Sequence, residues 1–151
     1  MLRASIIAFL LAVAGSRSSA QWALGPVGGF DLGAKSNVIA GIGYAYPLKH
    51  AHGQKIGDAG VSLGVGYGIY KPHLFMPQIG AWWAGFFSLG CKIAASTDFN
   101  QTSILMVPEI GFGLGGFRFV WGFPLVMNNV TVEGLNTSQF SVYFFHPFHE
   151  E

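Results

Sequence analysis

The chain has 151 residues, of which 51% are hydrophobic and only 10% are charged. A soluble domain usually carries roughly a quarter charged residues, so these charges are too few to cover a water-soluble globule well. The formal net charge of +1, without a concentrated basic face, argues against a nucleic-acid-binding protein. The single cysteine excludes an intramolecular disulfide, so a small secreted domain would need another device, such as a closed sheet.

The first 20 residues have the pattern of a secretory signal peptide. Arg3 precedes an apolar run over residues 4–14, and Ser18 and Ala20 supply the small residues of a cleavage site. The run is shorter than an ordinary membrane-spanning helix requires. We therefore predict a signal peptide over residues 1–20 and one domain over residues 21–151, with an uncleaved anchor as the alternative.

Glycine-rich segments with alternating character come next along the chain. Residues 22–33, 37–47 and 59–70 are predicted strands, and residues 48–58 are predicted to form a polar connection between the last two. The third segment, AGVSLGVGYGIY, is the most regular. Glycine or serine occupies one face of it, and the other face carries bulky apolar residues such as Val61, Leu63 and Val65. Period-two alternation of this kind indicates a β-strand.

Residues 78–97 form a nearly continuous apolar run that periodicity does not resolve. This run fits one long bent strand, two strands broken near Gly85, or a helix. Residues 102–116 and 117–126 then predict a hairpin that turns at Gly115-Gly116. A polar loop follows over residues 127–137, and residues 138–148 close the chain as a strand. The total is seven or eight strands, and single-chain bacterial barrels use even numbers, which favours eight.

The bare glycine face and the bulky face together predict which side of the sheet meets lipid. A strand facing lipid directs apolar side chains outward and can keep small ones inward, and about 9–11 tilted residues span a membrane. In an eight-stranded barrel the interior is only wide enough for side chains to fill. We therefore predict an all-β fold: a small antiparallel up-and-down transmembrane β-barrel, with Leu63 outside and Gly64 inside.

The charged residues support this orientation. Most of them, Asp31 included, are predicted to lie in connections or at the ends of segments. Only Lys92, Glu109 and Arg118 fall inside apolar segments, and their parity places all three toward the lumen. We predict that they form an interior polar cluster with a Glu109–Arg118 contact that helps to plug the barrel. The alternative is that these charges reach water at strand ends.

Motifs of catalytic, cofactor and metal sites give weak signals. Residues 111–116 match GxGxxG, but a dinucleotide site needs this loop to open a helix, and the following FRFVWGF alternates like a strand. His50 and His52 lie close together in a polar loop, yet no fixed third ligand is evident. No spacing singles out a nucleophile with its base. We predict no catalytic residue, no cofactor and no metal.

Three segments resemble a group of small, largely uncharacterised outer-membrane β-barrel proteins of Bacteroidetes type. They are STDF (residues 96–99), PEIGFGLGGFRFVWGFPL (residues 108–125) and FSVYFF (residues 140–145). In this chain Trp121-Gly122-Phe123 replaces the group's Tyr-Gly-Tyr strand. Outer-membrane barrels also commonly end on an aromatic residue, whereas Phe148 is followed here by His149-Glu150-Glu151. The resemblance implies an outer-membrane barrel and brings no established activity.

We therefore expect a non-enzymatic protein of the cell outer membrane with a structural, surface-interaction or small-ligand role. Its expected partners are outer-membrane lipid and the barrel assembly machinery, with no nucleic acid. One alternative is a secreted soluble β-barrel that binds an apolar ligand in its lumen, as lipocalins do. A second alternative makes residues 79–95 a membrane helix.

Overall fold

The computed structural model describes residues 23–33, 36–49, 55–71, 73–114, 116–133, 135 and 137–146. The predicted signal peptide over residues 1–20 lies outside the described residues. All regular structure in the described part is β. The strands are β1 (Ala23–Leu32), β2 (Asn37–Lys49), β3 (Lys55–Gly68), β4 (Phe75–Ala84), β5 (Phe87–Thr97), β6 (Thr102–Leu114), β7 (Phe117–Gly122), β8 (Leu125–Val126) and β9 (Gln139–Phe145).

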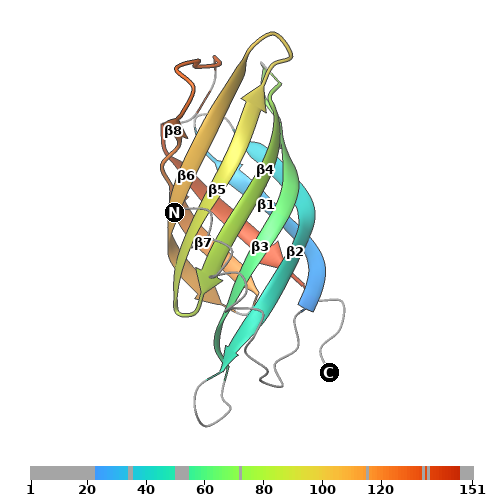
Figure 1. The fold of residues 1–151 in the computed structure, drawn as a ribbon, viewed down its shortest axis with the longest axis vertical. Helices are drawn as coiled ribbons and strands as arrows, with labels where there is room; N and C mark the ends of the chain where they lie inside the picture. Colours follow the sequence, from blue (N-terminus) through green and yellow to red (C-terminus); the bar gives the residue numbers. More distant parts are fainter. Residues whose placement is uncertain are drawn as a thin grey trace, which may run out of the picture.

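The strands form one closed antiparallel cylinder (Figure 1). Each strand from β1 to β7 pairs with its neighbour in sequence, and β9 pairs with both β7 and β1, which closes the sheet. β7 and β8 pair with successive parts of β6 and form one strand interrupted at Phe123-Pro124. Proline has no N–H for a ladder hydrogen bond, which accounts for the interruption. The prediction of an eight-stranded up-and-down barrel is confirmed.

The apolar region that periodicity left open is two strands. β4 ends at Ala84, β5 begins at Phe87, and the N–H of Gly85 donates to the carbonyl of Phe87 at 2.8 Å in the turn between them. A break near Gly85 was one of the three alternatives, and it is the correct one. Within the described part of the chain, no helix has the length and apolar character needed to cross a membrane.

The predicted polar connection over residues 48–58 is largely wrong. β2 continues to Lys49 and β3 begins at Lys55, with Pro47 opposite Asp58 and a bulge at Leu48/Lys49. The apolar segment predicted to begin at residue 78 begins earlier, because residues 75–77 open β4. Backbone hydrogen bonds carry the pairing past the apolar segment into polar residues, so side-chain alternation underestimates the length of these strands.

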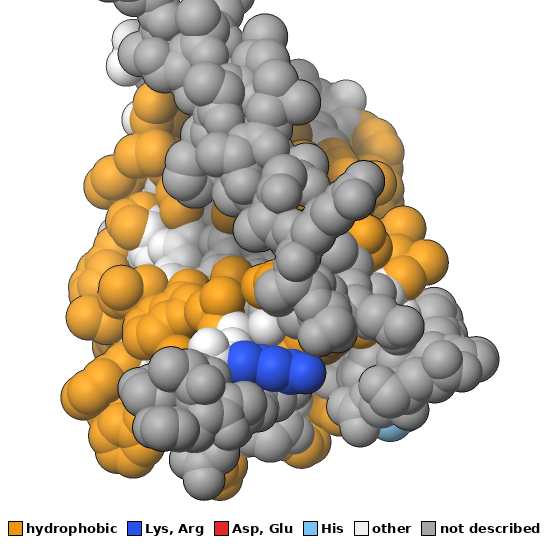
Figure 2. All heavy atoms as spheres, turned by 60° about the horizontal axis from the view of Figure 1, so that its bottom comes forward, with side chains coloured by type: hydrophobic (Ala, Val, Ile, Leu, Met, Phe, Trp, Pro, Cys, Tyr) orange, Lys and Arg blue, Asp and Glu red, His pale blue; other side chains and the backbone are white. Residues whose placement is uncertain are grey.

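Bulky apolar side chains point away from the cylinder axis. Leu63 and Ile79, at paired positions on β3 and β4, are 59% and 57% exposed. Figure 2 shows hydrophobic side chains over most of the described surface around one end of the barrel. Glycines face inward where neighbouring backbones come close, and a Cβ added to Gly111 would overlap the carbonyl oxygen of Phe119. Glycine at this position therefore permits the tight coiling that a small barrel requires.

The two ends of the barrel differ in their connections. The lower end in Figure 1 carries the turn at residues 85–86, the short connection from β6 to β7, the end of β2 with the start of β3, the start of β1 and the end of β9. The upper end carries the connections at residues 33–36, 69–74, 98–101 and 127–138. We use the terms lower end and upper end in this sense below.

Candidate functional site in the barrel lumen

Five buried polar residues meet near the middle of the lumen, each from a different strand. We call them the lumen cluster: Asp31 (β1), Lys92 (β5), Glu109 (β6), Arg118 (β7) and Tyr143 (β9). Each of them is at most 8% exposed. β5, β6 and β7 follow one another along the chain, whereas Asp31 on β1 reaches the others only because β9 pairs with both β7 and β1 and closes the barrel.

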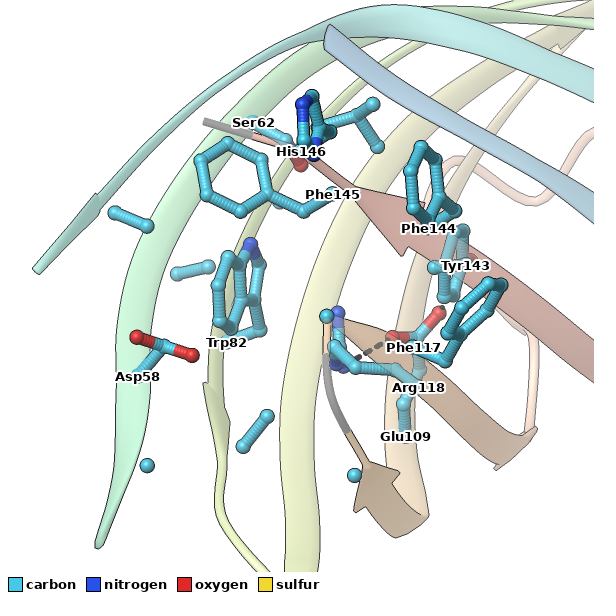
Figure 3. A pocket seen from close by; sticks show the side chains of 18 of the residues that line it. Asp58, Ser62, Trp82, Glu109, Phe117, Arg118, Tyr143, Phe144, Phe145 and His146 are labelled. Atoms are coloured by element: carbon cyan, nitrogen blue, oxygen red, sulfur yellow. Dashed lines mark hydrogen bonds and ion pairs between the residues drawn. The ribbon is translucent and has the colours of Figure 1, made fainter. Parts of the chain in front are cut away.

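The structure brings together the three residues proposed from the sequence as an interior cluster. The carboxylate of Glu109 lies between two cations, with Oε2 3.2 Å from Arg118 Nη2 and Oε1 3.5 Å from Lys92 Nζ. Figure 3 shows the Arg118 side chain reaching toward Glu109. Their side chains are 4–9% exposed, so the alternative in which they reach water at strand ends does not describe this structure.

Asp31 corrects a prediction, because it is not a strand-end charge in solvent. It is 2% exposed, and its carboxylate lies 3.3 Å from Lys92 Nζ and accepts a hydrogen bond of 2.6 Å from Ser141 Oγ. The signal was present in the sequence, since Asp31 shares parity with Val27 and Gly29 on the inward face of β1. Its position near the end of the segment concealed that parity.

Tyr143 was not predicted to belong to the lumen cluster. It contacts Glu109 directly and also contacts Lys92, which in turn contacts Asp31. Its hydroxyl accepts a hydrogen bond from Lys92 Nζ at 2.6 Å and donates one to Glu109 Oε1 at 2.8 Å. Both cations also lie 5.3 Å from the centroid of its ring. The sequence signal that could have found it is the inward series Gln139, Ser141 and Tyr143 on the closing strand.

Arg118 makes two further contacts. Its Nε donates to Ser88 Oγ at 2.9 Å, and its guanidinium lies 5.3 Å from the ring centroid of Trp82. The adjacent Trp83 points outward and is 37% exposed, as alternation along a strand requires. A planar guanidinium with five N–H donors suits such multiple contacts better than an ammonium group does.

The lumen cluster contains two carboxylates and two cations and is formally neutral. Removing four charges from water is costly, and close pairing with additional hydrogen bonds is what offsets the cost. Among the described residues, no group of three or more His, Cys, Asp or Glu side chains is placed to hold a metal ion. The arrangement forms a neutral polar partition across the middle of the lumen.

Below this partition lies a cavity of about 840 Å³, which we call the lower cavity. Lys92, Glu109, Arg118 and Tyr143 line one side of it, and residues of the lower turns, such as Gly85 and Gly116, line the other. Trp82 and Phe145 stand on its wall with ring centroids 5.9 Å apart (Figure 3). Small inward residues, including Ala45, Ser62 and Gly80, leave the remaining space open.

Above the partition, side chains fill the lumen. Val132, from the connection between β8 and β9, is fully buried and packs with Leu74 and Met76, with Leu135 against them. Ser103 fixes this connection, because its hydroxyl donates to the Val130 carbonyl and accepts from the Val132 N–H at 2.8 Å. The segment predicted as a polar loop over residues 127–137 thus supplies apolar side chains that close the upper end of the lumen.

Other residues weighed in the sequence take no part in this site. Cys91 is exposed on the outer face. His73 Nδ1 donates a hydrogen bond to the Gly68 carbonyl at 3.0 Å, and its ring stacks on Tyr67. The GxGxxG match begins at the end of β6 and does not open a helix. His50, His52 and His149 lie outside the described residues.

The fold and the lumen define a small, closed, eight-stranded antiparallel β-barrel. Comparisons with protein-family models, with curated proteins and with solved structures give no match.

Proposed function

We propose that this protein is a non-enzymatic β-barrel of the outer membrane that crosses the lipid as a closed, non-conducting cylinder. The observation that carries the proposal is the inverted distribution of polarity. Large apolar side chains are exposed on the outer wall, while the charges of the lumen cluster are 2–7% exposed inside it. A barrel in water would require the opposite arrangement.

The outer wall has the dimensions of a membrane-spanning surface. β2, β3 and β6 contain 13, 14 and 13 residues, and about 9–11 tilted residues are enough to cross the hydrocarbon region. Exposed apolar residues recur around the cylinder, for example Leu63, Ile93, Ile110 and Phe119. A monomeric soluble protein rarely leaves an apolar surface of this extent open to water.

The connections indicate an orientation in the membrane. Barrels of this class have short periplasmic turns and longer extracellular loops. The lower end has short turns and carries the start of β1 and the end of β9. It is therefore assigned to the periplasm, and the upper end to the outside. Outer-membrane lipid and the barrel assembly machinery are the partners that follow, and the resemblance of residues 96–99 and 108–125 to Bacteroidetes-type barrels supports the same assignment.

Two barriers in series support a closed lumen. Ions would have to pass both the lumen cluster and the packed residues around Val132. The roles that remain are structural, an interaction at the loops of the upper end, or the binding of a small ligand. The alternative of a secreted soluble barrel would expose Leu63 and its neighbours to water.

Membrane extraction and a substitution in the wall test the proposal. The protein should stay in the membrane pellet after carbonate washing, and its unboiled form should migrate differently from the boiled form on a gel. Leu63→Arg, near the middle of β3, should reduce stability in lipid vesicles by roughly 2–4 kcal/mol, whereas Tyr70→Arg beyond the end of β3 should cost about 0–1 kcal/mol.

Three results would contradict the proposal. They are release of the protein by carbonate, equal effects of Leu63→Arg and Tyr70→Arg, and a large stable conductance in planar bilayers.

A further inference from the structure

We infer that the lower cavity is a binding site for an uncharged molecule with an apolar chain, which enters from the lower end. This inference rests on the proposed function only for the side of the membrane from which the ligand arrives. The size of the cavity is the first observation. About 840 Å³ lies within the roughly 300–1,000 Å³ that small-molecule sites occupy.

The walls of the cavity suit an apolar chain. Ala45, Gly80 and Ala84 present no polar side-chain atoms, and the Trp82 and Phe145 rings meet at an interplanar angle of 56°. Two aromatic faces at this separation provide a large contact area for methylene groups. The lumen cluster supplies polar groups on one side of the cavity, and Lys49, Asp58 and His146 line it as well, with Asp58 and His146 lying apart from the cluster (Figure 3). Mostly apolar walls with a few convergent polar groups are the general anatomy of a small-ligand site.

The lumen cluster determines the charge that the ligand can carry. Its two carboxylates already balance its two cations, so an anionic or cationic head group would leave one buried charge without compensation. A hydroxyl or amide head group brings no net charge, and its oxygen can face the Arg118 guanidinium, which lines the cavity. Lys49 and Asp58, which also line the cavity, add one charge of each sign, so the charged lining as a whole stays balanced and favours an uncharged ligand.

Access is possible from one end only within the described structure. The lumen cluster and the packing of Val132 with Leu74 and Met76 close the upper side. The cavity extends to residues of the lower turns, including Gly85, Phe86 and Gly116. In the orientation proposed above, the ligand comes from the periplasm.

Native mass spectrometry of the full chain in amphipol tests this inference, with 1-decanol, decanoate and decylammonium as probes of equal chain length. Decanol should bind saturably at one molecule per barrel, and the two charged probes roughly tenfold or more weakly. Ser62→Phe fills the cavity and should reduce decanol binding at least tenfold. Val61→Phe changes the neighbouring residue on the outer face, which does not line the cavity, and should leave decanol binding unchanged.

A change in the charge of the lumen cluster provides the second arm. Glu109→Gln leaves the cluster with one excess positive charge, so decanoate should gain roughly tenfold relative to decanol. Asp31→Asn makes the same change from a residue that does not line the cavity, and it serves if Glu109→Gln fails to give the heat-modifiable folded form.

Several results would overturn the inference: absence of saturable decanol binding, equal binding by Ser62→Phe and Val61→Phe, or tighter binding of decanoate than of decanol by the unaltered chain. Failure of this test with normal carbonate resistance and heat modifiability would leave the proposed function standing. Release of the protein by carbonate would contradict the proposed membrane location and would leave the inference about ligand binding in the lower cavity unaffected.

Discussion

The upper and lower halves of the lumen are enclosed by the same strands, yet one is filled and the other is hollow. The inward face of β6 shows the reason. In the upper half it carries Leu105 and Val107, which are 3% and 1% exposed, and in the lower half it carries Gly111 and Gly113. The number of strands fixes the width of the cylinder, while the size of the inward side chains decides whether space remains inside it.

The lumen cluster is the boundary between the two halves and should show the largest effect on mutation. Arg118→Gln leaves Glu109 buried with Lys92 as its remaining cation, and loss of one partner from a buried ion pair costs about 3–5 kcal/mol. Urea unfolding in lipid vesicles measures the effect. Lys49→Gln, at the exposed lower end of β2, is the control and should change little. Equal stability of the two variants would mean that the cluster does not hold the barrel together.

The difference in free space can be tested by adding the same side chain on either side of the boundary. Ser96 is fully buried near the upper end of β5, so Ser96→Leu should destabilise the barrel by roughly 1–3 kcal/mol through overpacking. Ser62 lines the lower cavity, so Ser62→Leu should fall within about 0.5 kcal/mol of the unaltered chain. Chemical unfolding in the same vesicles compares them, and a larger cost for Ser62→Leu would refute a hollow lower half.

Val132 is the fully buried side chain that the connection between β8 and β9 contributes to the packing of the upper half. Val132→Ala removes two methyl groups from a fully buried position and should cost roughly 1.5 kcal/mol, at about 0.8 kcal/mol for each. Val130→Ala, two residues earlier and 37% exposed, is the matched control. Conductance should stay absent in both variants because the lumen cluster lies below. If Val132→Ala alone opened a stable channel, the cluster would not be a barrier.

The smallest expected effect is at the turn between β5 and β6, outside the lumen. Backbone N–H groups of Gln101 and Asn100 donate to the Asp98 carboxylate and hold its pKa below the ordinary value of 3.8. Since the folded pKa is lowered, this contribution is present above about pH 4 and is lost as the pH falls through the folded pKa. Amide exchange at residues 100 and 101 should therefore rise at low pH, while amides of the lower turns change less. Unchanged protection of the residue 101 amide from exchange at low pH would contradict this prediction.

Much of the barrel was predictable because its rules are local and periodic. Alternation in β3 gave the strand and its outward face, and parity placed Lys92, Glu109 and Arg118 on the inward side. Contacts set by closure were not predictable. Asp31 and Tyr143 lie 112 residues apart in sequence and meet only because β1 pairs with β9. Val132 has no periodic neighbours, so its burial follows from the shape of the upper lumen alone. The free volume below the lumen cluster likewise depends on all the strands together.

The pairing of β1 with β9 has a consequence for how the chain assembles. Every other ladder joins strands that follow one another along the sequence, whereas this one places Val27 opposite Phe145. A growing sheet can therefore extend hairpin by hairpin, but its first edge stays unpaired until the last strand is available. A circular permutant can be made by joining the two chain ends with a linker and opening the chain at the turn of residues 85–86. It would preserve every ladder, and β9 and β1 would then follow one another along the sequence.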